Sequence, residues 1–121
     1  MRLKFDKIIE TVTHIQQEAG KIHLNPEQHL LDSQIVWKSG GRDYTNVVDI
    51  AVENFQKQEL TKNFPEIGFL GEETDSKIAR FMWYIDPTDG TAVYSTGGHY
   101  YSNSIALVDR KTGKVLFGSV Y

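Results

Sequence analysis

Residues 83–91 read Trp-Tyr-Ile-Asp-Pro-Thr-Asp-Gly-Thr, in which an apolar run leads into two carboxylates, Asp86 and Asp89. A second acidic pair, Gly71-Glu72-Glu73, follows another short apolar run upstream. Short apolar runs bounded by Gly and Pro are typical of strands, so both acidic pairs are predicted to lie at strand ends. Pro87 disfavours helix at Asp86, so we expect the Asp86 carboxylate to leave its strand end and point into a cleft.

Carboxylates that converge from two strand ends can bind a hard cation such as Mg²⁺, which prefers oxygen ligands. Gly90 permits backbone conformations that bring N–H groups close to a ligand, so a phosphate could lie between these groups and the cations. The Thr91 hydroxyl could hold an attacking water together with Glu72. The pattern therefore predicts a Mg²⁺-dependent phosphate-ester site.

The acidic residues also permit a purely structural interpretation. Asp-Pro and Asp-Gly pairs are ordinary turn sequences, and a Glu pair at a strand end is commonly solvated. The combination is more specific than either motif, because clustered carboxylates repel one another when no cation is present. A metal site is therefore favoured over a structural turn.

Composition excludes several classes of protein. The 121 residues fit one domain, here 1–121, and the net charge of −3 without a basic run argues against a nucleic-acid polymer as partner. The absence of cysteine excludes disulfides and thiolate metal sites. The charged first 20 residues do not resemble a signal peptide, and no apolar run has the length of a membrane span. We expect a cytoplasmic enzyme or binding protein.

Two amphipathic helices are predicted before the acidic motifs. The first covers about residues 2–22 and the second 45–63, with Thr45 or Asn46 as its N-cap, and each has apolar residues at three- and four-residue steps. Residues 23–33 are predicted as a loop and 34–38 as a short strand. None of the four histidines has the helical spacing of a metal site, so we interpret all of them as surface or incidental residues: His14, His23, His29 and His99.

Further strands are predicted after the helices. They cover residues 67–71, 81–85, 103–109 and 115–121, and a hairpin turn joins the last two at 110–114. Strands that follow helices in this way predict an α+β fold. We expect two N-terminal helices packed on a mainly antiparallel sheet.

The same motifs resemble the inositol monophosphatase family. Its signature is an acidic pair after Gly, followed by Asp-Pro-Ile/Leu-Asp-Gly-Thr, and this chain has Gly71-Glu72-Glu73 and then Asp86-Pro87-Thr88-Asp89-Gly90-Thr91. Other segments agree in order along nearly the whole chain: Lys38-Ser39-Gly40, Arg42-Asp43-Tyr44, Asp49, Phe64-Pro65 and Gly118-Ser119-Val120-Tyr121.

The resemblance implies a role for each matching residue. It implies metal ligation by Glu72, Asp86, Asp89 and the backbone carbonyl of Thr88. Catalytic roles are implied for Glu72, Thr91 and Asp49, and phosphate contacts for Gly90 and Thr91. It further implies lithium-sensitive, Mg²⁺-dependent hydrolysis of inositol monophosphate or a related sugar or nucleotide phosphate.

The chain also departs from the family pattern. Asn46 stands where a Thr is expected before Asp49, and Val93-Tyr94 replace an Asn-Phe pair. Family members are longer and have a further metal-binding aspartate, so the chain resembles an N-terminal half with its C-terminal half absent. We therefore expect a homo-oligomer or a C-terminal half as partner. The alternative is a catalytically incomplete metal-binding or interaction protein on the same fold.

Overall fold

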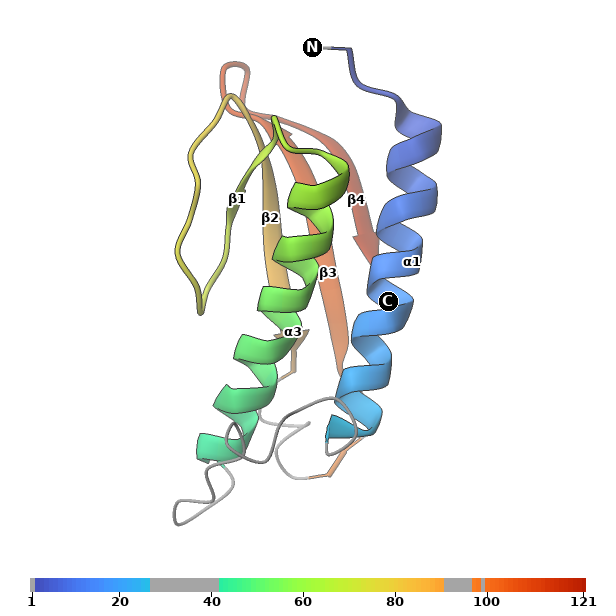
Figure 1. The fold of residues 1–121 in the computed structure, drawn as a ribbon, viewed down its shortest axis with the longest axis vertical. Helices are drawn as coiled ribbons and strands as arrows, with labels where there is room; N and C mark the ends of the chain where they lie inside the picture. Colours follow the sequence, from blue (N-terminus) through green and yellow to red (C-terminus); the bar gives the residue numbers. More distant parts are fainter. Residues whose placement is uncertain (1, 27–41, 91–96, 99) are drawn as a thin grey trace.

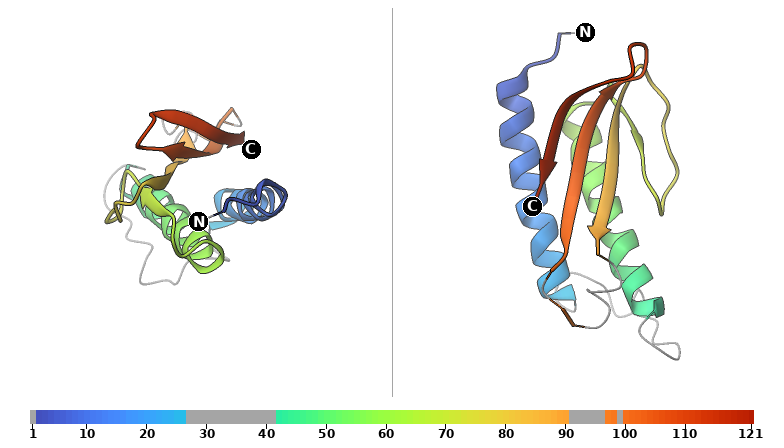
Figure 2. Two further views of the ribbon diagram at one scale, coloured as in Figure 1. Left: turned by 90° about the horizontal axis from the view of Figure 1, so that it is seen from above. Right: turned by 180° about the vertical axis from the view of Figure 1, so that it is seen from behind.

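The computed structural model describes residues 2–26, 42–90, 97–98 and 100–121 and shows two helices on one face of a four-stranded sheet (Figure 1). The elements are α1 (Phe5–Leu24), α3 (Arg42–Asn63), β1 (Gly68–Leu70), β2 (Phe81–Asp89), β3 (Ser102–Asp109) and β4 (Lys114–Val120). The strand order is β1-β2-β3-β4, with β1 parallel to β2 and the other pairs antiparallel. Seen from above, both helices lie on the same side of the sheet (Figure 2). The predicted α+β architecture is confirmed.

Helix α1 forms because one apolar stripe repeats at helical spacing along it. Ile8, Val12, Ile15 and Ala19 on this stripe are buried. The helix begins and ends later than the predicted 2–22. Gly20 does not end it, and a Cβ built there would lie 2.9 Å from the ring of Tyr121. The bare backbone of this turn therefore packs close to that ring.

Helix α3 begins at Arg42, earlier than the predicted residue 45. Thr45 and Asn46 consequently lie inside the helix, and the prediction that either caps it was wrong. Residues 42–63 contain no Gly or Pro, so nothing in this segment breaks the helix. Pro65 disfavours helix just beyond its C-terminal end. Neither helix in the described part of the chain combines the length and apolar character needed to cross a membrane.

The core lies between the helices and the sheet. Trp83 and Ile85 on β2 alternate with exposed Tyr84 and pack with helix residues such as Ile8 and Leu60. Strand β1 ends at Leu70, opposite Tyr84, after three residues. In the described structure, β2 therefore continues past the end of β1. Asp86 lies in this part of β2, and Glu72 follows the end of β1.

Strand β2 is longer than the predicted 81–85. It runs through Pro87 to Asp89, with a register irregularity between Asp86 and Asp89 in its pairing with β3. Asp86 therefore lies within the strand, and the prediction that it leaves a strand end was wrong. The hairpin that joins β3 to β4 is confirmed, with Gly113 at φ +72° in its turn. The predicted strand 34–38 lies outside the described residues.

Candidate metal centre

Three carboxylates lie near one another beside the end of β1. Glu72 follows β1, Asp86 lies in β2 and Asp49 lies in α3. Burial raises the pKa of all three above the ordinary values, and the negative charges of nearby carboxylates raise each pKa further. Among the described residues, the charged groups that act on these three carboxylates are all carboxylates themselves. Glu72, Asp86 and Asp49 thus lie near enough for their charges to interact, whereas their predicted roles as metal ligands and catalytic residues stay predictions.

The parallel register explains why Glu72 and Asp86 meet. Leu70 pairs with Tyr84, and the two strands run in the same direction. Two residues after this pair, the chain reaches Glu72 on one side and Asp86 on the other. Both residues line a shallow hollow of about 400 Å³ that also includes Tyr84 and Ser104. The expectation that Asp86 faces a hollow is therefore confirmed, although Asp86 reaches it from within the strand.

A chain of hydrogen bonds joins Asp49 to α1 through β2. The Thr88 hydroxyl lies 2.5 Å from Asp49 Oδ1, and His23 Nε2 lies 2.7 Å from the same hydroxyl oxygen. Asp49, Thr88 and His23 are all buried. This contact connects the two helices to the strand that presents Asp86.

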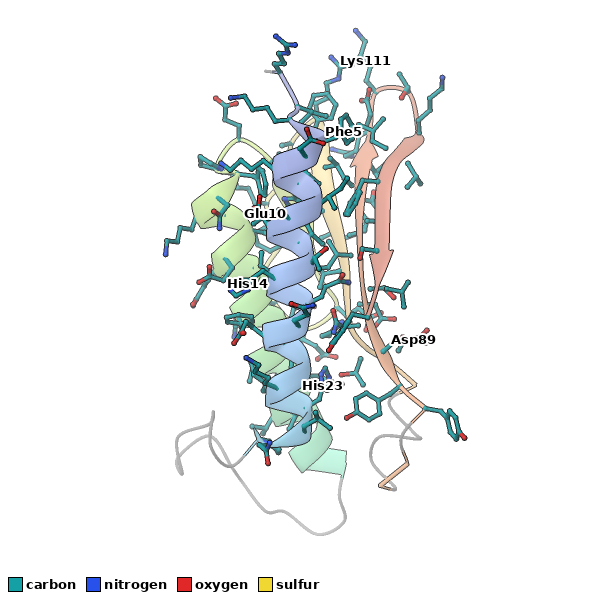
Figure 3. The ribbon with its side chains drawn as sticks, turned by 90° about the vertical axis from the view of Figure 1, so that its right-hand side faces the viewer. Phe5, Glu10, His14, His23, Asp89 and Lys111 are labelled. Atoms are coloured by element: carbon teal, nitrogen blue, oxygen red, sulfur yellow. The ribbon has the colours of Figure 1, made fainter. Side chains whose placement is uncertain are left out.

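His23 contradicts the prediction that every histidine is a surface or incidental residue. It is 4% exposed, within α1 rather than in a loop, and Figure 3 shows it on the side of α1 that faces the sheet. Burial lowers its pKa to about 4, and a hydrogen bond to the Ala19 backbone opposes that shift. Helix α1 ends at Leu24 rather than at the predicted residue 22, so its buried face includes His23 directly after Ile22. His14 is exposed as predicted, whereas His29 and His99 lie outside the described residues.

The remaining predicted residues lie around the end of β2. The Thr88 side chain donates a hydrogen bond to Asp49. The predicted metal contact of the Thr88 backbone carbonyl stays a prediction. Asp89 is exposed and lies at the lower end of the sheet, on the side away from α1 (Figure 3). Gly90 has φ +89°, and a Cβ there would lie 3.0 Å from the Tyr100 carbonyl oxygen, which explains the glycine. Thr91 lies outside the described residues.

Glu53 belongs to this region and was missed by the sequence analysis. Its side chain is fully buried in α3, and its carboxylate accepts hydrogen bonds from the backbone N–H groups of Glu72 and Glu73. Glu53 stands one helical turn after Asp49, so both carboxylates share one face of the helix. A charged residue at core spacing, among buried Val52 and Gln56, is the signal that could have identified it.

The side chains fit a hard cation in chemistry but do not form a complete site. All the candidate ligands offer oxygen, and their mutual repulsion would be relieved by a bound cation. Among the described residues, no three His, Cys, Asp or Glu side chains converge closely enough to hold a metal ion.

Comparison with known sequences identifies related proteins. The model of the inositol monophosphatase family matches residues 4–121. The chain is 38% identical over 104 residues to the Nus factor SuhB of Xylella fastidiosa, a match that covers 84% of this chain and 38% of that protein. It is 33% identical over 86 residues to a fructose-1,6-bisphosphatase/inositol-1-monophosphatase of Aquifex aeolicus, covering 69% of this chain and 32% of that protein. The chain thus spans well under half the length of these relatives.

Solved structures share the fold. The extragenic suppressor protein suhB of Bartonella henselae superposes with a TM-score of 0.73 at 26% identity, over 94% of this chain and 43% of that one. Inositol monophosphatase-II of Staphylococcus aureus superposes with a TM-score of 0.71 at 28% identity, over 94% of this chain and 41% of that one.

Proposed function

This chain belongs to the inositol monophosphatase family, and we propose that its acidic cluster serves Mg²⁺-dependent hydrolysis of a phosphate monoester. The preferred substrate class is an inositol monophosphate or a related sugar or nucleotide phosphate. One observation supports this function most directly: Asp49 of α3, Asp86 of β2 and Glu72 after β1 lie near one another, and among the described residues the charges that shift their pKa values are all negative. Such a cluster is costly without a cation.

In this proposal Glu72, Asp86, Asp89 and the Thr88 carbonyl would hold Mg²⁺, with Asp49 beside them. When bound, Mg²⁺ supplies Lewis acidity at a phosphoryl oxygen and makes water a stronger nucleophile. Glu72 orients the attacking water with the Thr91 hydroxyl. The water loses a proton as its oxygen forms a bond to phosphorus, the ester P–O bond breaks, and the departing alcohol oxygen takes up a proton, so that no net proton is consumed.

The phosphate position follows from the end of β2. Gly90 adopts a left-handed conformation that a larger residue would strain, so the chain turns sharply directly after Asp89. Backbone N–H groups in such a turn can face an anion. The turn at Gly90 supports a phosphate contact there, and we assign a second contact to Thr91 from the family resemblance alone.

Phosphate release from myo-inositol 1-phosphate with Mg²⁺ tests the proposal. We expect release by the 121-residue chain that falls to background in Asp86→Asn, because this variant removes a ligand charge. Asp6→Asn, which removes an exposed carboxylate from the first turn of α1, is the matched control and should retain full activity. Li⁺ should reduce the release. Activity of Asp86→Asn within twofold of the unsubstituted chain would contradict the assignment.

A second candidate is metal binding without turnover by this chain. The absence of three convergent ligand side chains in the described residues favours it, as does the share of each relative that the chain spans. In that case a C-terminal half or a second copy would complete the site. No phosphate release, combined with a melting temperature that rises with Mg²⁺ or Mn²⁺, is the expected result. A cytoplasmic location remains part of the proposal.

A further inference from the structure

The buried carboxylate of Glu53 accepts hydrogen bonds from the backbone of the acidic pair, and a buried carboxylate needs such donors. The carboxylate accepts from the Glu72 N–H at 2.6 Å through Oε1, and from the Glu73 N–H at 3.0 Å through Oε2. A third contact joins Glu73 N–H to Oε1 at 3.2 Å. We call this arrangement the Glu53 contact. Among the described residues Glu53 has no ion pair, and the donors to this buried carboxylate are backbone N–H groups.

Gly71 makes room for the Glu53 contact. A Cβ at Gly71 would lie 2.5 to 2.7 Å from the carboxylate atoms of Glu53, which is closer than atoms can approach. The Gly in Gly71-Glu72-Glu73 therefore has a specific role: its backbone lets a helix carboxylate reach the two N–H groups that follow. At this point the Glu53 side chain of α3 packs directly against the backbone of Gly71.

The Glu53 contact leaves the Glu72 side chain free. Glu53 binds the backbone of Glu72 and Glu73, while the Glu72 side chain lines the hollow with Asp86. Both oxygens of Glu53 accept hydrogen bonds from backbone N–H groups, so the carboxylate is directed at the backbone of the acidic pair. The contact therefore holds the backbone of Glu72 in place and does not involve the Glu72 side chain.

We propose that Glu53 is a positioning residue. Its carboxylate holds the Glu72-Glu73 backbone so that the Glu72 side chain can bind the same cation as Asp86. The inference rests on the proposed metal site and extends it to a residue with no direct ligand role. Residues that orient metal ligands commonly change metal affinity by about 10- to 100-fold when substituted. We expect that range for Glu53.

The first experiment needs no metal. Glu53→Asp keeps the charge but is one methylene shorter, so it should release the Glu72 and Glu73 amides. We expect these two amides to exchange with solvent at least about tenfold faster by NMR, relative to the core amide of Leu107, which reports global opening. Gly71→Ala should have the same effect with Glu53 intact. Unchanged exchange in both variants would overturn the proposal.

Gln56→Leu is the matched control for a damaged helix interior. Gln56 is fully buried one turn after Glu53, but its amide donates to Asn103 Oδ1 rather than to the acidic pair. This variant should lower the stability of the fold while leaving the relative exchange of the Glu72 and Glu73 amides unchanged. Faster exchange of those amides in Gln56→Leu as well would show a general loosening and overturn the assignment to Glu53.

The second experiment measures Mn²⁺ affinity of the full chain by calorimetry. We expect Kd to rise about 10- to 100-fold in both Glu53→Asp and Glu53→Gln, and to stay within twofold in Gln56→Leu. If Glu53→Asp binds as tightly as the unsubstituted chain and only Glu53→Gln is weakened, Glu53 acts through charge and the positioning role is wrong. A chain that binds no Mn²⁺ overturns the proposed function, and amide exchange then decides the positioning role independently.

Discussion

At the scale of single residues, Thr88 connects a carboxylate of the proposed site to α1. Its hydroxyl lies between Asp49 Oδ1 and His23 Nε2, in a buried position. A buried carboxylate is stabilised by the donors that reach it, and loss of one leaves an expensive unsatisfied oxygen. The hydroxyl is therefore expected to stabilise both the fold and the placement of Asp49.

Thr88→Val tests this role with little change of shape. We expect unfolding in urea to show a loss of about 1–3 kcal/mol, because the Asp49 oxygen loses this donor. Thr88→Ser keeps the hydroxyl and is the control, with a smaller loss from the missing methyl group. Equal stability of the Val and Ser variants would show that the hydroxyl does not stabilise the fold.

Asp109 provides a pH prediction far from the acidic cluster. Both of its oxygens accept from Arg80, each at 3.1 Å, and the backbone N–H of Lys111 also donates to it. The hydrogen bonds from Arg80 lower the pKa of Asp109 from 3.8 to about 2. Because the pKa is lower in the folded state, the stabilisation is complete above about pH 4 and disappears as the pH falls toward 2.

We therefore expect Asp109→Asn to be less stable than the unsubstituted chain at pH 5, and this difference to shrink steadily as the pH falls from 4 toward 2. Urea unfolding of both proteins at several pH values measures the difference, and the contributions of all other carboxylates cancel in it. A difference that is constant across this range would contradict the lowered pKa.

At the scale of elements, buried amides join α1 to the last two strands. Gln16 Nε2 donates to the backbone carbonyls of Asn103 and Ser119, and Ser119 Oγ lies 2.5 Å from Gln16 Oε1. Asn103 in turn accepts from Gln56 of α3. These contacts fix how far each helix lies along the sheet, which apolar contacts alone do not specify.

The prediction at this scale compares two adjacent glutamines. Gln16→Leu should destabilise the fold by about 1–3 kcal/mol, because buried acceptors and the Ser119 hydroxyl lose their partner. Gln17→Leu makes the same chemical change at an exposed position and should stay within about 0.5 kcal/mol. Denaturant midpoints of the two variants give the comparison. Similar losses in both would mean that helix propensity, and not the buried contacts, causes the effect.

At the scale of the whole molecule, the sheet has a face and an edge that the described residues leave uncovered. Both helices pack on one face, and the views from above and behind show the other face open (Figure 2). Strand β4 forms one edge, and Val115 and Val120 on it are 66% and 70% exposed. An unpaired apolar edge favours association with another chain.

We expect the 121-residue chain to self-associate as its concentration rises, and Val120→Lys to weaken that association. Sedimentation velocity measures both. Ile9→Lys, at a half-exposed position on α1, is the control and should associate like the unsubstituted chain. A chain that stays monomeric at all concentrations and binds no dye specific for apolar surface would contradict this prediction.

Several features could be predicted from the order of residues. The stripes of α1 and α3 repeat at three and four residues, and such periodicity specifies a helix with a buried face wherever the rest of the chain lies. The acidic motifs drew attention to Glu72 and Asp86, because carboxylates that follow short apolar runs are a local pattern. The hairpin between β3 and β4 was equally predictable from its turn residues.

Other features required the tertiary structure, because they depend on contacts between distant segments. Asp86 stays within β2 since pairing with β3 continues to Asp89 despite Pro87. His23 is buried because β2 places Thr88 against it, 65 residues along the chain. Glu53 contacts the Glu72 N–H across 19 residues. Local sequence specified which segments form helices and strands and which residues are acidic, whereas only packing decided which of these groups share one site.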